Sequence, residues 1–171
     1  MFTIGHSTLP VEDFIATLHN HGATWIADVR TIPRSRHNSQ FNRDILPITL
    51  QAAGIGYTWI SALGGLRRAK PDSLNAGWRN LSFRGYADYM QTADFQAGLA
   101  ELLTIAGAPA VTLMCAEAVP WRCHRSLIAD ALLVRGLPVE HIMGPGTRNP
   151  HKLTPWARVE GMAITYPLVV P

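Results

Sequence analysis

The sequence contains few cysteines and no long apolar run. Two cysteines in 171 residues are too few for a disulfide-stabilised scaffold. No stretch reaches the roughly 18 uninterrupted apolar residues that a membrane helix needs. The N-terminal residues also lack the basic and apolar segments of a secretion signal. These absences favour a cytoplasmic protein with reduced thiols and no membrane partner.

Lysine and the common nucleotide-binding motifs are also scarce or absent. There is neither a P-loop nor a Gly-x-Gly-x-x-Gly fingerprint, which disfavours ordinary ATP or NAD binding. Of the 15 basic residues, only Lys70 and Lys152 are lysine. Arginine makes planar, two-pronged contacts with phosphate. The arginine excess is therefore compatible with a phosphate-bearing ligand, although a GC-rich genome would produce the same bias.

Short apolar runs alternate with helical patterns along the whole chain. Strands are expected at residues 2–5, 24–29, 55–60, 110–114 and 139–143. Helices are expected from Pro10 to near Gly22, up to Gly54, at 86–90, from Thr92 to near Gly107, and from Cys123 to Gly136. Near-continuous apolar strands are typical of a parallel sheet covered on both faces. The sequence therefore predicts a three-layer α/β/α single domain, Rossmann-like, with a mainly parallel sheet of about five strands.

The expected domain covers residues 1–146. Residues 147–171 form a C-terminal tail that is rich in proline and glycine. For this tail the sequence favours a small hairpin around Gly161, packed on the domain.

The connecting segments differ strongly in chemistry. Helix-to-strand links are short and contain few reactive side chains, whereas strand-to-helix links hold nearly all reactive residues. Because the carboxyl ends of parallel strands share one edge of the sheet, where α/β proteins bind ligands, these links predict one cleft. The residues expected to bind substrate or an anion there are Ser7, Asp28, Arg30, Arg34, Ser35, Gly64, Gly65 and Arg125.

The segment from Cys115 to Arg125 is the most specific feature. It holds both cysteines, Glu117 and His124 between a predicted strand and a predicted helix. A thiol at a helix N-terminus among cations should have a lowered pKa, so we expect Cys123 to react faster than Cys115. Glu117 could act as a base or pair with an arginine. Both cysteines could instead be buried packing residues.

Other candidates also have structural alternatives. His6 directly follows the first predicted strand and could take part in catalysis or be a hydrogen-bonded structural residue. Asp28 and Arg30 could bind an anion or form a salt bridge with each other. Gly64 and Gly65 could admit a ligand close to the backbone or only form a turn.

Several of these motifs occur together in one known family. They are Thr3-Ile-Gly-His-Ser7, Asp28-Val-Arg30 with Pro33, Ser35 and Phe41, Leu63-Gly-Gly65, Tyr86 with Met90, Met114-Cys-x-Glu117 and Cys123-His-Arg125. Over residues 2–143 the chain resembles the domain of unknown function 488 family. The resemblance implies a bacterial or archaeal α/β domain with these motifs at a shared site, and it implies no established activity.

Three functions are compatible with the sequence. The leading hypothesis is an enzyme acting on a phosphate-bearing small molecule or nucleic acid, without a cofactor, with Cys115, Glu117, His6, Cys123 and His124 carrying the chemistry. The second is a zinc or iron site built from Cys115, Cys123, His124 and His6, although the spacing matches no compact zinc finger. The third is a non-catalytic nucleic-acid-binding module that stacks bases on Trp78 and Trp121.

Overall fold

The computed structural model describes residues 1–107 and 110–168. Residues 108–109, in the link before the fourth expected strand, and residues 169–171, at the end of the expected tail, lie outside the described residues. The described chain forms a six-stranded sheet in the order β3-β2-β4-β1-β5-β6. The strands are β1 (Phe2–Gly5), β2 (Trp25–Asp28), β3 (Gly56–Trp59), β4 (Val111–Cys115), β5 (Glu140–Gly144) and β6 (Thr147–Pro150). The first five are parallel, and β6 runs antiparallel to β5.

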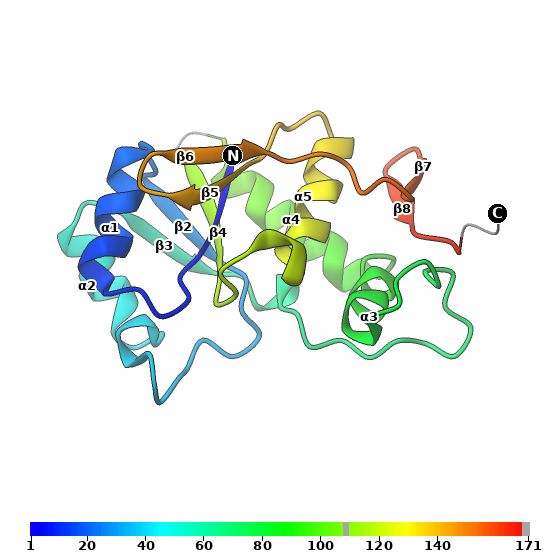
Figure 1. The fold of residues 1–171 in the computed structure, drawn as a ribbon, viewed down its shortest axis with the longest axis horizontal. Helices are drawn as coiled ribbons and strands as arrows, with labels where there is room; N and C mark the ends of the chain where they lie inside the picture. The colour runs from blue at the N-terminus through cyan, green and yellow to red at the C-terminus, as the bar shows by residue number, and fades with distance from the viewer. Residues whose placement is uncertain (108–109, 169–171) are drawn as a thin grey trace.

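Helices cover both faces of the sheet, in three layers. The α-helices are α1 (Val11–Asn20), α2 (Leu46–Ala52), α3 (Leu81–Tyr89), α4 (Ala93–Ile105) and α5 (Arg125–Val134). Neighbouring residues of β4 point to opposite faces, so Met114 packs with the core under α1 and α2. Leu113 packs with the core under α3, α4 and α5. Figure 1 shows α1 and α2 grouped apart from the other helices. The predicted α/β domain is confirmed.

Two of the helix starts illustrate what local sequence specifies. The Thr92 hydroxyl accepts a hydrogen bond from the Phe95 N–H, so Thr92 caps α4 as predicted. α3 begins several residues before the expected position at 86, because the Asn80 side chain caps it by accepting from the N–H groups of Ser82 and Phe83. Among residues 1–107 and 110–168, no helix is long and apolar enough to cross a membrane.

The segment after residue 146 is built into the domain. β6 extends the sheet, so the expected boundary falls inside the β5–β6 hairpin. Beyond it, the buried Asp130 carboxylate of α5 accepts hydrogen bonds from Thr154 and Tyr166. β7 (Arg158–Glu160) and β8 (Ala163–Thr165) then form a hairpin that turns at Gly161, whose φ is +60°.

The chain changes direction between β1 and β4, which are neighbours in the sheet. It leaves β1 through α1 on one face and leaves β4 through α5 on the other. Such a change of direction opens a crevice at the carboxyl ends of the two strands. Gly5 and Cys115, the last residues of β1 and β4, are paired in register at this point.

Candidate functional site

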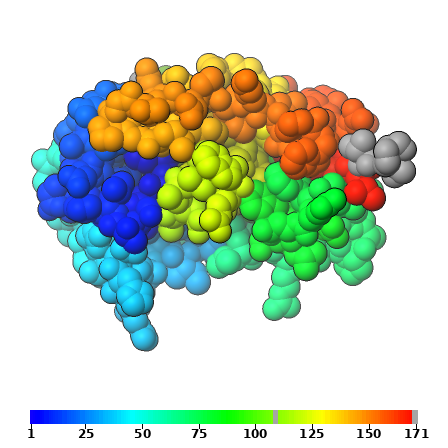
Figure 2. All heavy atoms as spheres, in the orientation of Figure 1, coloured from blue at the N-terminus to red at the C-terminus, as the bar shows by residue number. Residues whose placement is uncertain are grey.

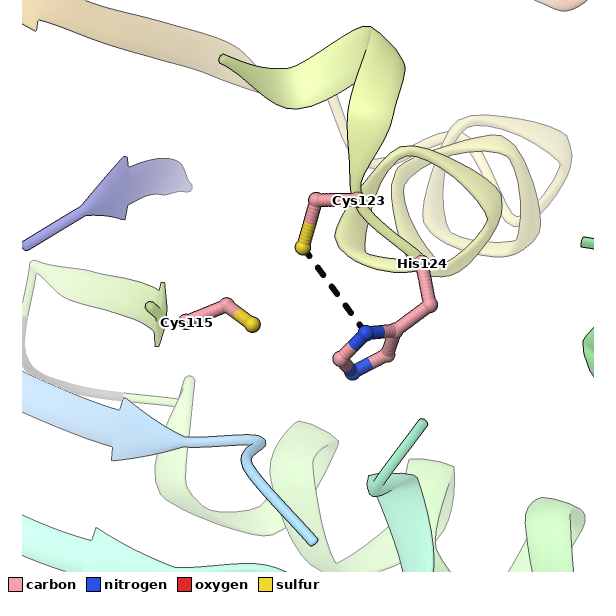
Figure 3. Close-up of side chains that lie close together, drawn as sticks. All are labelled: Cys115, Cys123 and His124. Carbon is pink, nitrogen blue, oxygen red and sulfur yellow. Dashed lines mark hydrogen bonds between the residues drawn. The ribbon is translucent and has the colours of Figure 1, made fainter. Parts of the chain in front are cut away.

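Three side chains from two segments meet at the carboxyl end of β4. Cys115 is the last residue of β4, and Cys123 and His124 directly precede α5. Between the two cysteines the chain forms a loop with the short 3₁₀ helix η3 (Pro120–Arg122). One ligand atom from each of the three residues lies within 4.8 Å of the other two. Figure 3 shows the three side chains around a common space.

The imidazole of His124 is held in one orientation. Its Nε2 lies 2.9 Å from the carbonyl oxygen of Val29, which can only accept, so Nε2 carries a hydrogen and donates it. Nδ1 therefore faces the thiols, and it lies 3.7 Å from Sγ of Cys123. The backbone at Gly65 passes against the same ring, since a Cβ there would lie 2.9 Å from Nδ1. Gly65 thus makes room for the His124 side chain, whereas the sequence analysis expected the glycine pair to admit a ligand or to form a turn.

The surroundings of the two thiols shift their pKa values in opposite directions. A hydrogen bond from Cys123 is the largest influence on Cys115 and lowers its pKa, with further help from His124 and the Glu117 backbone. The same interaction, together with burial, raises the pKa of Cys123. The surroundings therefore favour the thiolate at Cys115 over Cys123, and our expectation that Cys123 reacts faster stays a prediction for the alkylation experiment. Cys123 is 2% exposed, and the neighbouring sulfur is the largest influence on the pKa of each thiol.

A small cavity opens in front of these residues. Its volume is about 130 Å³, and it is lined by Gly65, Leu66, Ser82, Phe83, Tyr86, Cys115, Glu117, Arg122, Cys123 and His124. Glu117 and Arg122 are exposed, whereas Tyr86 is buried and donates its hydroxyl hydrogen to the carbonyl of Leu63. Figure 2 shows the loop that carries Glu117 and Arg122, in yellow-green, on the visible face between the blue and green segments. The sequence did not predict Phe83, Ser82 or Arg122 as site residues, because a single side chain on a helix or loop forms no recognisable sequence motif.

His6 adjoins this group, since its backbone N–H donates to the Cys115 carbonyl at 3.0 Å, but its side chain bonds within a second cluster. Its Nδ1 lies 2.9 Å from the Ser7 carbonyl and its Nε2 lies 3.2 Å from Arg30 Nη1, so both ring nitrogens are occupied. Burial, reinforced by Arg30, lowers the pKa of His6 to about 4. The ring also stacks on Phe41, with 4.1 Å between centroids. His6 is therefore a neutral, fully bonded residue in this structure and does not join the cysteines as a ligand.

Asp28 and Arg30 form a buried salt bridge, the structural alternative considered above. Two bonds of 2.9 and 2.6 Å join their side chains, and Arg30 also donates to the carbonyl of Phe41. Tyr57 donates its hydroxyl hydrogen to the same carboxylate at 2.7 Å. With these partners Arg30 is only 6% exposed, so the geometry does not support a role for it in binding an anion.

The Arg125 side chain also forms its hydrogen bonds within the protein. Its guanidinium donates to the carbonyls of Glu117 and Ala118 and thereby fixes the loop between the cysteines. The side chain is 1% exposed. The geometry therefore supports a bracing role and not the expected anion-binding role.

The remaining candidates lie elsewhere. Ser7 has a φ of 46° and lines a different cavity, which also includes Asp13. Ser35 organises a turn by accepting from the N–H groups of His37 and Asn38, and Arg34 is exposed beside it. Gly64 packs against Thr31. The structure thus gathers Cys115, Glu117, Cys123, His124 and Gly65 around one cavity, and the other predicted residues do not line it.

Of the two tryptophans expected to stack on bases, only Trp121 is open to solvent, at 65% exposure. Trp78 packs on Phe83 with 4.8 Å between ring centroids.

The comparisons with known proteins identify a family and nothing beyond it. Neither the curated proteins nor the solved structures include a match to this chain. A family model matches residues 10–132, which begins after the Gly5-His6-Ser7 motif and includes both cysteines, Glu117 and His124. Because this match covers most of the chain, the protein belongs to the family described as domain of unknown function DUF488.

Proposed function

We propose that this protein is a transition-metal enzyme whose ion is held by Cys115, Cys123 and His124. The observation that carries the proposal is the convergence of two sulfur atoms and one imidazole nitrogen within 4.8 Å. Zinc binds thiolate at about 2.3 Å and imidazole at about 2.0–2.1 Å in a tetrahedron, so its ligand atoms lie roughly 3.5 Å apart. The Sγ–Nδ1 distance of 3.7 Å between Cys123 and His124 is close to that separation. Zinc is the expected ion, and iron is the alternative.

The surroundings of His124 support this proposal. Metal-binding histidines usually donate their second ring N–H to a carbonyl or carboxylate, which orients the ring. The bond from His124 Nε2 to the Val29 carbonyl has this form. The spacing of these residues in the sequence matches no zinc finger. This does not argue against the proposal, because the three proposed ligands come from two separate segments that the fold brings together.

The open side of the centre favours catalysis over a purely structural role. Structural zinc sites have four protein ligands, whereas catalytic sites have three and leave one position for water or substrate. Here the three ligands line the cavity of about 130 Å³, which admits only a small part of a substrate. A bound zinc ion would supply Lewis acidity at that position.

Two exposed residues complete the proposed chemistry. Glu117 lines the cavity and can accept a proton from an attacking water. Arg122 also lines it and, within the described residues, makes no ion pair, so its guanidinium is available for a phosphate group. We therefore propose hydrolysis of a phosphate-bearing small molecule or nucleic acid.

A metal-free thiol enzyme is the second candidate. It is favoured by the lowered pKa of Cys115, which makes that sulfur a nucleophile at neutral pH. The two proposals differ by two protons. In the first, the Cys123 sulfur and Nδ1 of His124 are both lone-pair ligands; in the second, Cys123 keeps its hydrogen and Nδ1 donates a proton to the Cys115 thiolate.

Metal content and thiol reactivity separate the two candidates. For the metal enzyme we expect about one zinc or iron per chain by elemental analysis and slow alkylation by iodoacetamide. A chelator should release the ion and accelerate alkylation. His124→Ala should abolish retention of the ion, whereas His37→Ala, at an exposed position, is the matched control.

Other outcomes of these measurements would contradict the metal proposal or both proposals. A protein that neither retains nor takes up zinc or iron contradicts the metal proposal. If Cys115 then alkylates faster than free cysteine at about pH 6.5, the thiol enzyme is supported. If it does not, both proposals are wrong.

A further inference from the structure

The loop between the cysteines also borders a second, larger cavity. This cavity has a volume of about 440 Å³ and lies where η3, β5 and the segment after β6 meet. It is lined by Trp78, Pro120, Trp121, Ser126, His141, Met143, Asn149, Pro150, His151, Lys152, Thr154, Pro155 and Trp156. In Figure 2 the yellow-green, orange and green segments that contribute these residues adjoin one another on the visible face. It shares no lining residue with the cavity of the cysteines.

Aromatic side chains dominate the wall. Three of the five tryptophans of the chain line this one cavity. Trp78 and Trp156 pack edge to face, with 5.0 Å between centroids, so their positions are fixed by each other. Trp121 stands on η3 with 65% of its surface exposed. Flat π-systems and neighbouring prolines provide surfaces on which a planar ring can stack.

Two hydrogen-bond donors in this wall have no acceptor. The indole N–H groups of Trp78 and Trp156 are buried and have no partner among the described residues. A buried donor left without an acceptor costs about 1–3 kcal/mol. Both nitrogen atoms are inaccessible to solvent, so they lie behind the surface of the cavity and a ligand there would not reach them.

Another part of the wall is polar, and its side chains are already joined by hydrogen bonds. The Asp130 carboxylate accepts from His151 Nε2 at 2.8 Å, and this leaves His151 Nδ1 to accept from His141 Nε2 at 3.0 Å. His141 Nδ1 in turn accepts from the hydroxyl of Thr3 at 2.7 Å. Every ring nitrogen is bonded, so both histidines are held in fixed orientations beside the cavity.

We propose that this cavity binds a planar heteroaromatic ring that carries hydrogen-bond acceptors, the chemistry of a nucleobase. The volume lies within the range of about 300–1,000 Å³ that small-molecule sites occupy. The stacking surfaces select a flat ring. The side chains of Asn149 and Lys152 in the lining can donate hydrogen bonds, which selects a ring with acceptors over a pure hydrocarbon. None of the residues that line this cavity is a cysteine or a proposed metal ligand.

Titration with adenosine and guanosine tests this site, with tryptophan fluorescence and calorimetry as readouts. We expect saturable quenching by at least one nucleoside and binding at least about ten-fold tighter than toluene, a flat ring without acceptors, or ribose. Trp121→Ala should weaken binding at least ten-fold without unfolding the protein, because this side chain is exposed. Lys152→Met keeps most of the side-chain volume but removes one donor from the lining and should also weaken nucleoside binding. Trp25→Phe, outside the cavity, is the matched control.

The double variant Cys115→Ser/Cys123→Ser should bind the nucleoside unchanged, which separates this site from the proposed metal centre. The inference is overturned if neither nucleoside saturates, if toluene binds as tightly, or if Trp121→Ala leaves the affinity unchanged. Loss of binding in the cysteine double variant would equally overturn the independence of the site.

Discussion

A Cβ atom added to Gly65 would lie 2.9 Å from Nδ1 of His124, the atom that we assign to the metal. This backbone segment and the Val29 carbonyl contact the imidazole through different atoms, so the ring has little freedom to move. The orientation of His124 is therefore set by two loops that follow β2 and β3, and not by its own helix.

Gly65→Ala should displace the imidazole and weaken zinc binding by about 10–100-fold, the range seen when the support of a metal ligand is removed. Competition with a chromogenic chelator measures this affinity. Gly146→Ala is the control, because a Cβ at Gly146 meets nothing within 4 Å. An unchanged affinity in Gly65→Ala would show that Nδ1 is not a ligand.

Cys123→Ala should raise the pKa of Cys115, because it removes the hydrogen bond that most lowers it. Cys123→Ser keeps a donor and should preserve part of the effect. In metal-free protein, the pH dependence of iodoacetamide alkylation measures the thiolate fraction. A fast thiol that survives in Cys115→Ser would instead assign the reactivity to Cys123, as the sequence analysis expected.

Arg30→Ala should destabilise the fold by about 3–5 kcal/mol, because it leaves the buried Asp28 carboxylate without its charge partner. Urea unfolding measures this change in the free energy of unfolding. Arg34→Ala, at an exposed position in the same loop, should change it by less than about 0.5 kcal/mol. If Arg30→Ala keeps its stability and loses phosphate affinity, the anion-binding interpretation is restored.

The free energy of unfolding should fall as the pH drops from about 6.5 to about 4. Burial lowers the pKa of His6 and of His141 from 6.5 to about 4 in the folded protein. In that window the unfolded chain binds more protons than the folded one, so each histidine removes up to about 1.4 kcal/mol per pH unit, and its contribution is complete only above about pH 6.5.

Urea unfolding at several pH values across that window measures this slope. His6→Gln, which retains an acceptor for Arg30, should reduce it by roughly half. A stability that stays constant between pH 7 and pH 5 would contradict the burial of both neutral rings.

The order of elements could be predicted from the sequence because it depends on local periodicity. Short apolar runs, helical patterns and caps such as Thr92 depend only on residues that are close together in the sequence. The location of the candidate site could be predicted from the same information, since parallel strands bring their carboxyl ends to one edge. Cys115, Glu117, Cys123 and His124 lie at that edge, around one cavity.

Which residues at that edge act together was decided only by the tertiary structure. His6 and Arg30 follow parallel strands and Cys115 ends one. Arg30 bonds to both His6 and Asp28, whereas Cys115 lies with Cys123 and His124. Similarly, Asp130 sits among apolar residues of α5, and its partners His151 and Tyr166 are 21 and 36 positions away. Sequence periodicity specifies the face on which a side chain lies. Its hydrogen-bond partners depend on directions and distances of about 3 Å that exist only once distant segments have packed.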